Sequence, residues 1–170
     1  MNFDVPEKAE LHRTHGGLAR NPPLPGNLRN WTAPDFDDVS WKKGRAPIGT
    51  GLFKWKNSPA TFKNQSEWGD GEFILARTAF DYDGSKHSAY RIRILAPRAY
   101  EIHLNGQAFH EYVWWKNLPH YQPVILDQGQ IGRLIKGVNH LSIYANRTDR
   151  RGPAQVDAVI EGLDLKGLAP

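Results

Sequence analysis

The sequence contains no cysteine among its 170 residues, which excludes disulfide bonds and thiolate metal sites. It also lacks any apolar run as long as a transmembrane helix requires, so we expect no membrane span. The first ten residues, MNFDVPEKAE, are polar and acidic and do not have the pattern of a signal peptide. These absences leave two expectations: an intracellular protein, or a piece of a longer secreted one.

Charge is nearly balanced, with 22 Lys and Arg against 18 Asp and Glu, a net charge of +4. A mildly basic chain favours an acidic partner without requiring one. The hydrophobic fraction of 39% indicates a globular domain that is long enough to bury a core. The 16 Gly and 12 Pro indicate many turns and few long helices, and the 6 Trp exceed ordinary usage.

The N-terminal segment, residues 1–28, shows no steady hydrophobic period and has three prolines at positions 22–25. This pattern predicts an extended arm or linker, with one short helix at 6–13. We expect folded structure to begin near Trp31, in a β-sandwich domain that spans residues 29–170.

The rest of the chain alternates apolar and polar residues in short runs, as β-strands do. These runs lie at 72–82, 88–95, 100–104, 139–145 and 156–163, with a shorter apolar run at 124–126. Strands at this spacing, separated by turns such as Asn105-Gly106, predict an all-β sandwich. Arg91 and Arg93 are expected on a solvated sheet face. The residues predicted to be buried between two sheets are Tyr90, Ile92, Ile94, Leu104, Leu141, Ile143 and Val159.

Three stretches carry a family resemblance: WTAPDFDDVSWKKGRAPIGTG (31–51), EFILARTAFDYDG (72–84), and YEIHLNGQ (100–107) followed by LIKGVNHLSIYA (134–145). Their succession resembles the galactose-binding-like jelly-roll modules of bacterial glycoside hydrolases, and it is similar to the sugar-binding domain of family 2 glycoside hydrolases. The resemblance implies a β-sandwich jelly roll that serves as a non-catalytic carbohydrate-binding module of a polysaccharide-degrading enzyme. The implied partners are a polysaccharide or oligosaccharide and a neighbouring catalytic domain. The implied location is secreted, periplasmic or cell-surface, as part of a longer protein.

The stretch YVWWKNLPHY, residues 112–121, is the first candidate site. Adjacent residues of an extended segment point to opposite faces, so Trp114 and Trp115 cannot both enter one core. The exposed indole then serves as a platform for a sugar ring, anchors its own loop, or contacts a neighbouring domain. The expected carbohydrate-binding residues are Tyr112, Trp114, Trp115, Lys116 and His120 of this stretch, Trp55 and Trp68 of the 52–70 loop, and Arg147 and Arg150 of the 145–153 loop.

Two further patterns concern ions and acidic ligands. Arg147, Arg150 and Arg151 present planar donor groups that suit the carboxylate or sulfate of an acidic glycan, unless they are simply solvated loop residues. Asp81 and Asp83 resemble a fragment of a calcium loop, and the related modules often hold a structural calcium, although no full ligand set is visible. We expect no other cofactor.

Other function classes have weaker support. Trp and Lys alternate in FKWK (53–56), as in single-strand binders, but acidic residues are spread throughout and we expect no nucleic-acid partner. No nucleophile motif or phosphate-binding glycine loop is present, so we do not expect an enzyme. The alternatives to a carbohydrate-binding module are a ligand-free structural domain that packs on a catalytic domain, and a stand-alone lyase or hydrolase.

Overall fold

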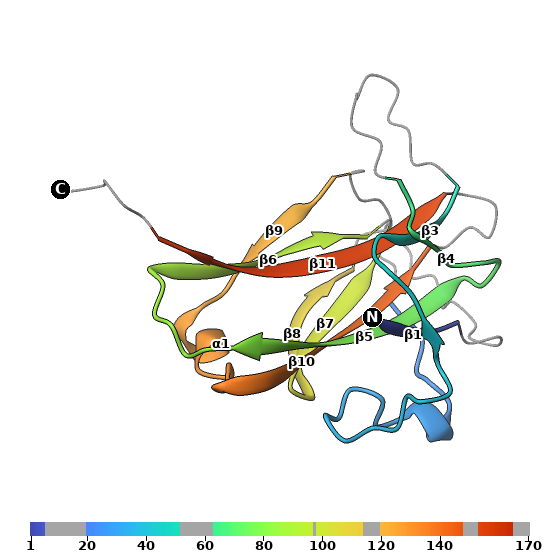
Figure 1. Ribbon diagram of the computed structural model, residues 1–170. Helices are drawn as coiled ribbons and strands as arrows, with labels where there is room; N and C mark the ends of the chain where they lie inside the picture. Colours follow the sequence, from blue (N-terminus) through green and yellow to red (C-terminus); the bar gives the residue numbers. More distant parts are fainter. Residues whose placement is uncertain (6–19, 52–62, 97, 114–119, 148–152, 165–170) are drawn as a thin grey trace.

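The computed structural model describes residues 1–5, 20–51, 63–96, 98–113, 120–147 and 153–164. Their strands form two sheets that face each other (Figure 1). The first sheet has the order β2-β1-β5-β10-β7-β8, with strands at Lys42–Lys43, Asn2–Asp4, Phe73–Tyr82, Gly137–Asn146, Tyr100–Leu104 and Gln107–Tyr112. The second has the order β4-β3-β11-β6-β9, with strands at Ser66–Glu67, Ile48–Thr50, Ala154–Leu163, Ala89–Leu95 and Gln122–Ile125.

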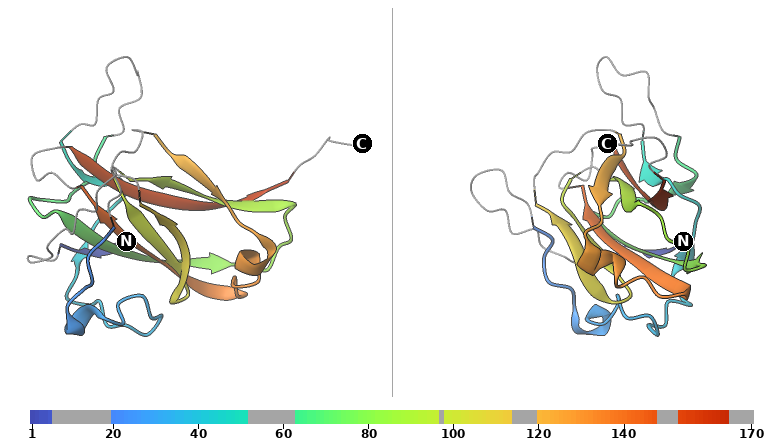
Figure 2. Two further views of the ribbon diagram at one scale, coloured as in Figure 1. Left: turned by 180° about the vertical axis from the view of Figure 1, so that it is seen from behind. Right: turned by 90° about the vertical axis from the view of Figure 1, so that its left-hand side faces the viewer.

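Eight of these strands have the connectivity of a jelly roll. β5, β10, β7 and β8 lie in one sheet, β3, β11, β6 and β9 lie in the other, and all their pairings are antiparallel. The chain alternates between the sheets, so that strands distant in sequence become neighbours, as β10 and β5 do. The two views of Figure 2 show the sheets from behind and from the end that carries α1 (Gln128–Ile131). The predicted β-sandwich jelly roll is therefore confirmed.

The core lies between the sheets and follows the predicted alternation of the strands. Along β6, Tyr90, Ile92 and Ile94 are buried, and Leu104, Leu141 and Ile143 meet them from the first sheet. Asn105 and Gly106, with φ of 51° and 81°, form the tight turn between β7 and β8 that their sequence predicts. Arg91 and Arg93 lie on the outer face of the second sheet, where Glu161 pairs with both.

Val159 is the exception to the predicted core. It pairs with Arg93 across the β11–β6 ladder and is 38% exposed, so its predicted burial is wrong. On β11 the inward face carries Ala154 and Val156, which are fully buried, and the half-buried Ile160. A strand with apolar residues on both faces gives no alternation from which the register could be read.

The outer face of the first sheet is covered by the segment 20–41, which carries the short 3₁₀ helix Gly26–Leu28. Trp31 and Trp41 stack with ring centroids 6.5 Å apart and pack with Phe73 and Tyr144. This second cluster lies outside the sandwich core and explains two of the six tryptophans without any ligand.

A buried arginine fastens the same segment to the sheet. Arg77, on β5, donates to the carbonyl oxygens of Phe36 and Ala33 at 2.9 and 2.6 Å and to the Asp38 carboxylate at 2.8 Å. Because each acceptor belongs to the covering segment, Arg77 ties it to the sheet.

The N-terminal arm differs from its prediction. Asn2–Asp4 form β1 and pair with Leu75–Arg77 of β5, so ordered structure begins well before Trp31. The short helix expected at 6–13 lies wholly outside the residues that the structure describes. No helix among the described residues is long and apolar enough to cross a membrane.

Candidate functional site

One side of the sandwich is open at the end near the β5–β6 turn. β1 pairs with β5 only at Leu75–Arg77, and β3 pairs with β11 only at Ala154–Val156. Beyond these contacts, residues 78–82 of β5 and 157–163 of β11 have no partner on that side among the described strands. Within the described residues, one edge of each sheet is therefore unpaired here, along β5 in the first sheet and β11 in the second. The pocket lies between these two edges.

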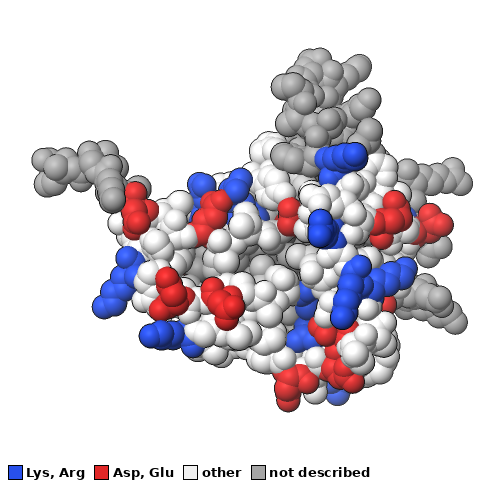
Figure 3. Space-filling view, in the orientation of Figure 1, with Lys and Arg blue, Asp and Glu red and all other residues white. Residues whose placement is uncertain are grey.

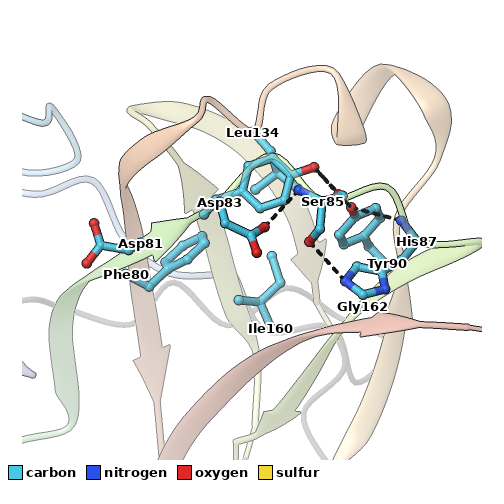
Figure 4. Close-up of a pocket in the computed structure, with 10 residues that line it drawn as sticks. Phe80, Asp81, Asp83, Ser85, His87, Tyr90, Leu134, Ile160 and Gly162 are labelled. Atoms are coloured by element: carbon cyan, nitrogen blue, oxygen red, sulfur yellow. Dashed lines mark hydrogen bonds between the residues drawn. The ribbon is translucent and has the colours of Figure 1, made fainter.

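The pocket has a volume of about 340 Å³, at the lower end of the ~300–1,000 Å³ range of small-molecule sites. Figure 3 shows the hollow between the sheets, with acidic side chains above and below it. Its wall combines aromatic and aliphatic side chains with a few polar ones (Figure 4). The lining residues are Phe80, Asp81, Tyr82, Asp83, Ser85, His87, Tyr90, Leu134, Ile160 and Gly162.

Two tyrosines hold the turn that closes the pocket. Tyr82 and Tyr90 meet edge to face with centroids 6.1 Å apart. Their hydroxyl oxygens lie 3.0 Å from each other, and both are within hydrogen-bonding distance of the carbonyl oxygen of Ser85, that of Tyr82 at 2.6 Å. The Tyr90 hydroxyl also accepts from the backbone N–H of His87 at 3.3 Å. The hydrogen bond with Tyr90, together with burial, raises the pKa of Tyr82. The turn is thus held by side chains of the two strands it connects.

Ser85, His87 and Asp164 form a hydrogen-bonded chain along one wall. Ser85 Oγ lies 3.2 Å from His87 Nε2, and His87 Nδ1 lies 3.0 Å from Asp164 Oδ1. A Cβ at Gly162 would lie 2.1 Å from the His87 ring, so only glycine lets the imidazole rest against β11. The chain fixes the ring orientation and joins the turn to the end of β11.

Asp83 supplies a carboxylate to the pocket. It accepts from the backbone N–H of Ser85 at 2.7 Å, and its hydrogen bonds with Ser85 lower the pKa of its carboxyl group. In Figure 4 Asp83 points between the two sheets, whereas Asp81 points away from the other labelled residues. Asp83 is therefore the carboxylate that a ligand in the pocket would meet.

Asp81 and Asp83, the predicted calcium ligands, have no third acidic or histidine ligand beside them among the described residues. Among the described residues, no group of three or more His, Cys, Asp or Glu side chains is placed to hold a metal ion. The two carboxylates point in different directions, and calcium prefers six to eight oxygen ligands. Calcium binding by these aspartates stays a prediction.

The site expected from the tryptophan-rich stretch is described only in part. Trp55, Trp114, Trp115, Lys116 and Arg150 lie outside the described residues, as does Arg151. Tyr112 stacks on Tyr100 with centroids 5.4 Å apart and packs against the core, while His120 is exposed. The role of this stretch in binding stays a prediction.

Trp68 and Arg147 do lie together, as expected, but not at the surface. The guanidinium carbon is 5.9 Å from the centroid of the indole, and each residue is only 1% exposed. The backbone N–H of Trp68 donates to Gly49 of β3, and that of Arg147 donates to Glu72, so both residues are held against the sandwich. This burial excludes the solvated position considered for Arg147. The part of Trp68 and Arg147 in carbohydrate binding stays a prediction.

Apart from Asp81 and Asp83, which were considered as calcium ligands, the residues of the edge pocket were not expected from the sequence to form a site. The stretch FDYDGSKH (80–87) carried a local signal, since two aromatic residues alternate with aspartates just before a Gly-Ser turn. Asp164 had no such signal, because it is 77 residues away from His87 in the chain.

Together, fold and pocket define a jelly-roll β-sandwich with a small-molecule-sized site at one open edge. No protein-family model matches the chain, and no curated protein matches it in sequence. Among solved structures, it is similar to a β-glycosidase from Bacteroides vulgatus (TM-score 0.46, 15% identity), with 77% of this chain and 18% of that chain covered. A glycosyl hydrolase family 2 member from Bacteroides cellulosilyticus gives TM-score 0.45 and 13% identity, with 96% and 18% covered.

A third likeness is to the PA14 sugar-binding domain from an RTX adhesin, with TM-score 0.31 and 16% identity, over 61% of this chain and 52% of that one. The chain spans about a fifth of the length of the two glycosidases, since it covers 18% of each. These likenesses accord with the galactose-binding-like resemblance of the sequence.

Proposed function

We propose that the protein is a carbohydrate-binding module that holds a sugar in the edge pocket without cleaving its glycosidic bonds. The observation that carries this proposal is the composition of the pocket wall. Phe80, Tyr82 and Tyr90 supply aromatic surface, and Asp83 and Ser85 supply fixed hydrogen-bonding groups beside it. A sugar ring needs both, because its C–H faces pack on aromatic rings while its hydroxyls need polar partners.

The setting that we propose is a longer, exported bacterial protein that degrades polysaccharide. The resemblance of the sequence to modules of bacterial glycoside hydrolases supports it. In that setting the module brings its catalytic neighbour to the polysaccharide. The arginines of the 145–153 loop suggested an acidic glycan as a ligand. The edge pocket does not favour an acidic glycan, because none of the described residues that line the pocket is Lys or Arg.

The test is affinity electrophoresis of the protein through gels that contain a panel of neutral, amino and acidic polysaccharides. Retardation by at least one polysaccharide is expected. Phe80→Ala should weaken it about two- to tenfold, the value of one stacked ring of ~0.5–1.5 kcal/mol. Val39→Ala is the matched control, because Val39 is 76% exposed and does not line the pocket. No retardation by any polysaccharide would contradict the proposal.

A structural accessory domain is the second candidate, and the outer face of the second sheet favours it. Ile125 is 60% exposed and Val159 is 38% exposed there, on either side of Arg91 and Arg93. Apolar side chains next to arginines are common where one domain packs on another. If this candidate is correct, the protein binds no polysaccharide but binds its catalytic domain when the two are mixed. The stand-alone lyase or hydrolase is tested in parallel, by release of soluble sugar over time.

A further inference from the structure

In the turn at residues 83–87, backbone N–H groups donate to neighbouring protein groups and are not available to a ligand. The backbone N–H of Ser85 donates to Asp83, and the N–H of His87 donates to the Tyr90 hydroxyl. The two tyrosine hydroxyls use their two hydrogens on the Ser85 carbonyl oxygen and on each other. A tyrosine hydroxyl carries a single hydrogen, so neither ring has a second one to offer a ligand.

The two hydrogen bonds that link Ser85 to His87 and His87 to Asp164 have one consistent donor-to-acceptor direction while His87 is neutral. A carboxylate only accepts hydrogen bonds, so the Nδ1 atom that faces Asp164 must carry the imidazole proton. Nε2 is then bare, and the single hydroxyl hydrogen of Ser85 is held between it and the Asp83 carboxylate. Ser85 Oγ is left with lone pairs and no hydrogen for the pocket. Asp164, which does not line the pocket, thus orients the imidazole beside an atom that does.

Asp83 adds an acceptor beside Ser85. Hydrogen bonds with Ser85 lower the pKa of its carboxyl group, which keeps it ionised at neutral pH, and in Figure 4 it points between the sheets. The polar side chains that face the ligand space therefore present acceptors. The cations nearby are Lys86, in the same turn and exposed, and Lys136, whose methylene groups pass beside Gly84.

We propose that this pocket selects its sugar by hydrogen-bond donors: hydroxyl or ammonium hydrogens of a neutral or amino sugar donate to Ser85 Oγ and the Asp83 carboxylate. A uronic acid is disfavoured, because it brings a carboxylate to a wall of acceptors. Asp164 and His87 act as positioning residues that, together with Asp83, hold the Ser85 hydrogen away from the ligand. The inference rests on the proposed function, since it names the sugar class that the same pocket takes.

The experiment compares sugars that differ at one group. Glucosamine, glucose and glucuronate are titrated into the 15N-labelled full chain at neutral pH, and so are galactosamine, galactose and galacturonate. In at least one series the amino sugar should bind about tenfold more tightly than the uronate, roughly the value of one hydrogen bond to a charged group. Shifted amide signals should include Ser85 and His87. Equal binding, or a tighter uronate, overturns the inference while sugar binding stands. No binding in either series contradicts the proposed function as well.

Variants separate selection from structure. Ser85→Ala should lower amino-sugar affinity about tenfold, whereas Ser88→Ala, in an exposed residue outside the pocket, should not. Asp164→Asn can donate to Nδ1, which moves the imidazole proton to Nε2 and turns the Ser85 hydrogen away from the imidazole, toward Asp83. Asp83 is then less able to accept from an ammonium group, so the variant should reduce the preference for the amino sugar yet keep binding of the neutral one. Loss of both alike, at unchanged melting temperature, would contradict the positioning role.

Discussion

His87 and Asp164 are 77 residues apart in the chain, yet Nδ1 of one lies 3.0 Å from Oδ1 of the other. The contact joins the turn between β5 and β6 to the end of β11. That turn leads from the first sheet, which contains β5, to the second sheet, in which β6 and β11 are neighbours. It therefore closes the open end of the sandwich at the pocket. The proposed sugar site depends on this contact, because it orients the imidazole beside Ser85.

Gly162→Ala is expected to disturb the pocket without unfolding the protein. The new Cβ would lie 2.1 Å from the His87 ring, so the ring must move away from Asp164 and Ser85. Sugar affinity should fall, and the His87 ring signals should shift in NMR spectra. Gly26→Ala is the control, because no atom lies within 4 Å of a Cβ placed there. Unchanged His87 signals in Gly162→Ala would contradict the packing described here.

Ile143→Ala should lower the free energy of unfolding by about 2–5 kcal/mol, because Ile143 is buried between the sheets and the substitution leaves a cavity. Val159→Ala should change it by less than ~0.5–1 kcal/mol, since that side chain faces solvent on the outer face. Urea denaturation of both variants measures the difference. Equal losses would mean that the β11 register is wrong.

Arg77→Met should loosen the segment that covers the first sheet. The substitution removes donors from the carbonyl oxygens of Phe36 and Ala33 and from the Asp38 carboxylate, at a cost of about 1–3 kcal/mol. Arg91→Met, which breaks a half-exposed ion pair with Glu161, should cost only ~0–1 kcal/mol. Hydrogen exchange at residues 31–41 should accelerate in the first variant alone. Protection that stays the same in Arg77→Met would contradict this role of the arginine.

Glu161 is expected to titrate below the ordinary pKa of a glutamate, about 4.3. Hydrogen bonds from Arg91 and Arg93 stabilise its charged form and lower the pKa of its carboxyl group. Because the folded-state pKa is lowered, this stabilisation is present above the unfolded pKa and is lost as the pH falls through the folded one. NMR titration of Glu161 in wild type and in Arg93→Met tests it. A side chain that titrates normally in both would show that the pairing does not persist in solution.

The tryptophan-rich stretch carries a separate prediction. Replacing whichever of Trp114 and Trp115 is exposed by Ala should weaken polysaccharide binding about tenfold without lowering the melting temperature, if the stretch is a sugar platform. If an acidic glycan binds there through arginines of the 147–151 region, its affinity should fall as salt is raised. A lower melting temperature with unchanged binding would instead identify a loop anchor.

The sequence alone determined six of the eleven described strands, most of the core and the sandwich. Alternation along 88–95 and 139–145 is a local property, and it correctly predicted that Tyr90, Ile92, Ile94, Leu141 and Ile143 are buried. Local patterns failed where both faces of a strand are apolar, as at Val159, and where a few residues pair with a distant strand, as Asn2–Asp4 do with β5.

The pocket and the burial of Trp68 were decided only by the tertiary structure. A tryptophan in a loop has the same local sequence whether its ring is exposed or lies under an arginine such as Arg147. Likewise, the meeting of His87 with Asp164 depends on where β1 and β3 end along β5 and β11, and on the glycine at position 162. These are relations between segments far apart in the chain. Side-chain periodicity carries no information about them, because it records which face a residue occupies and not what lies opposite.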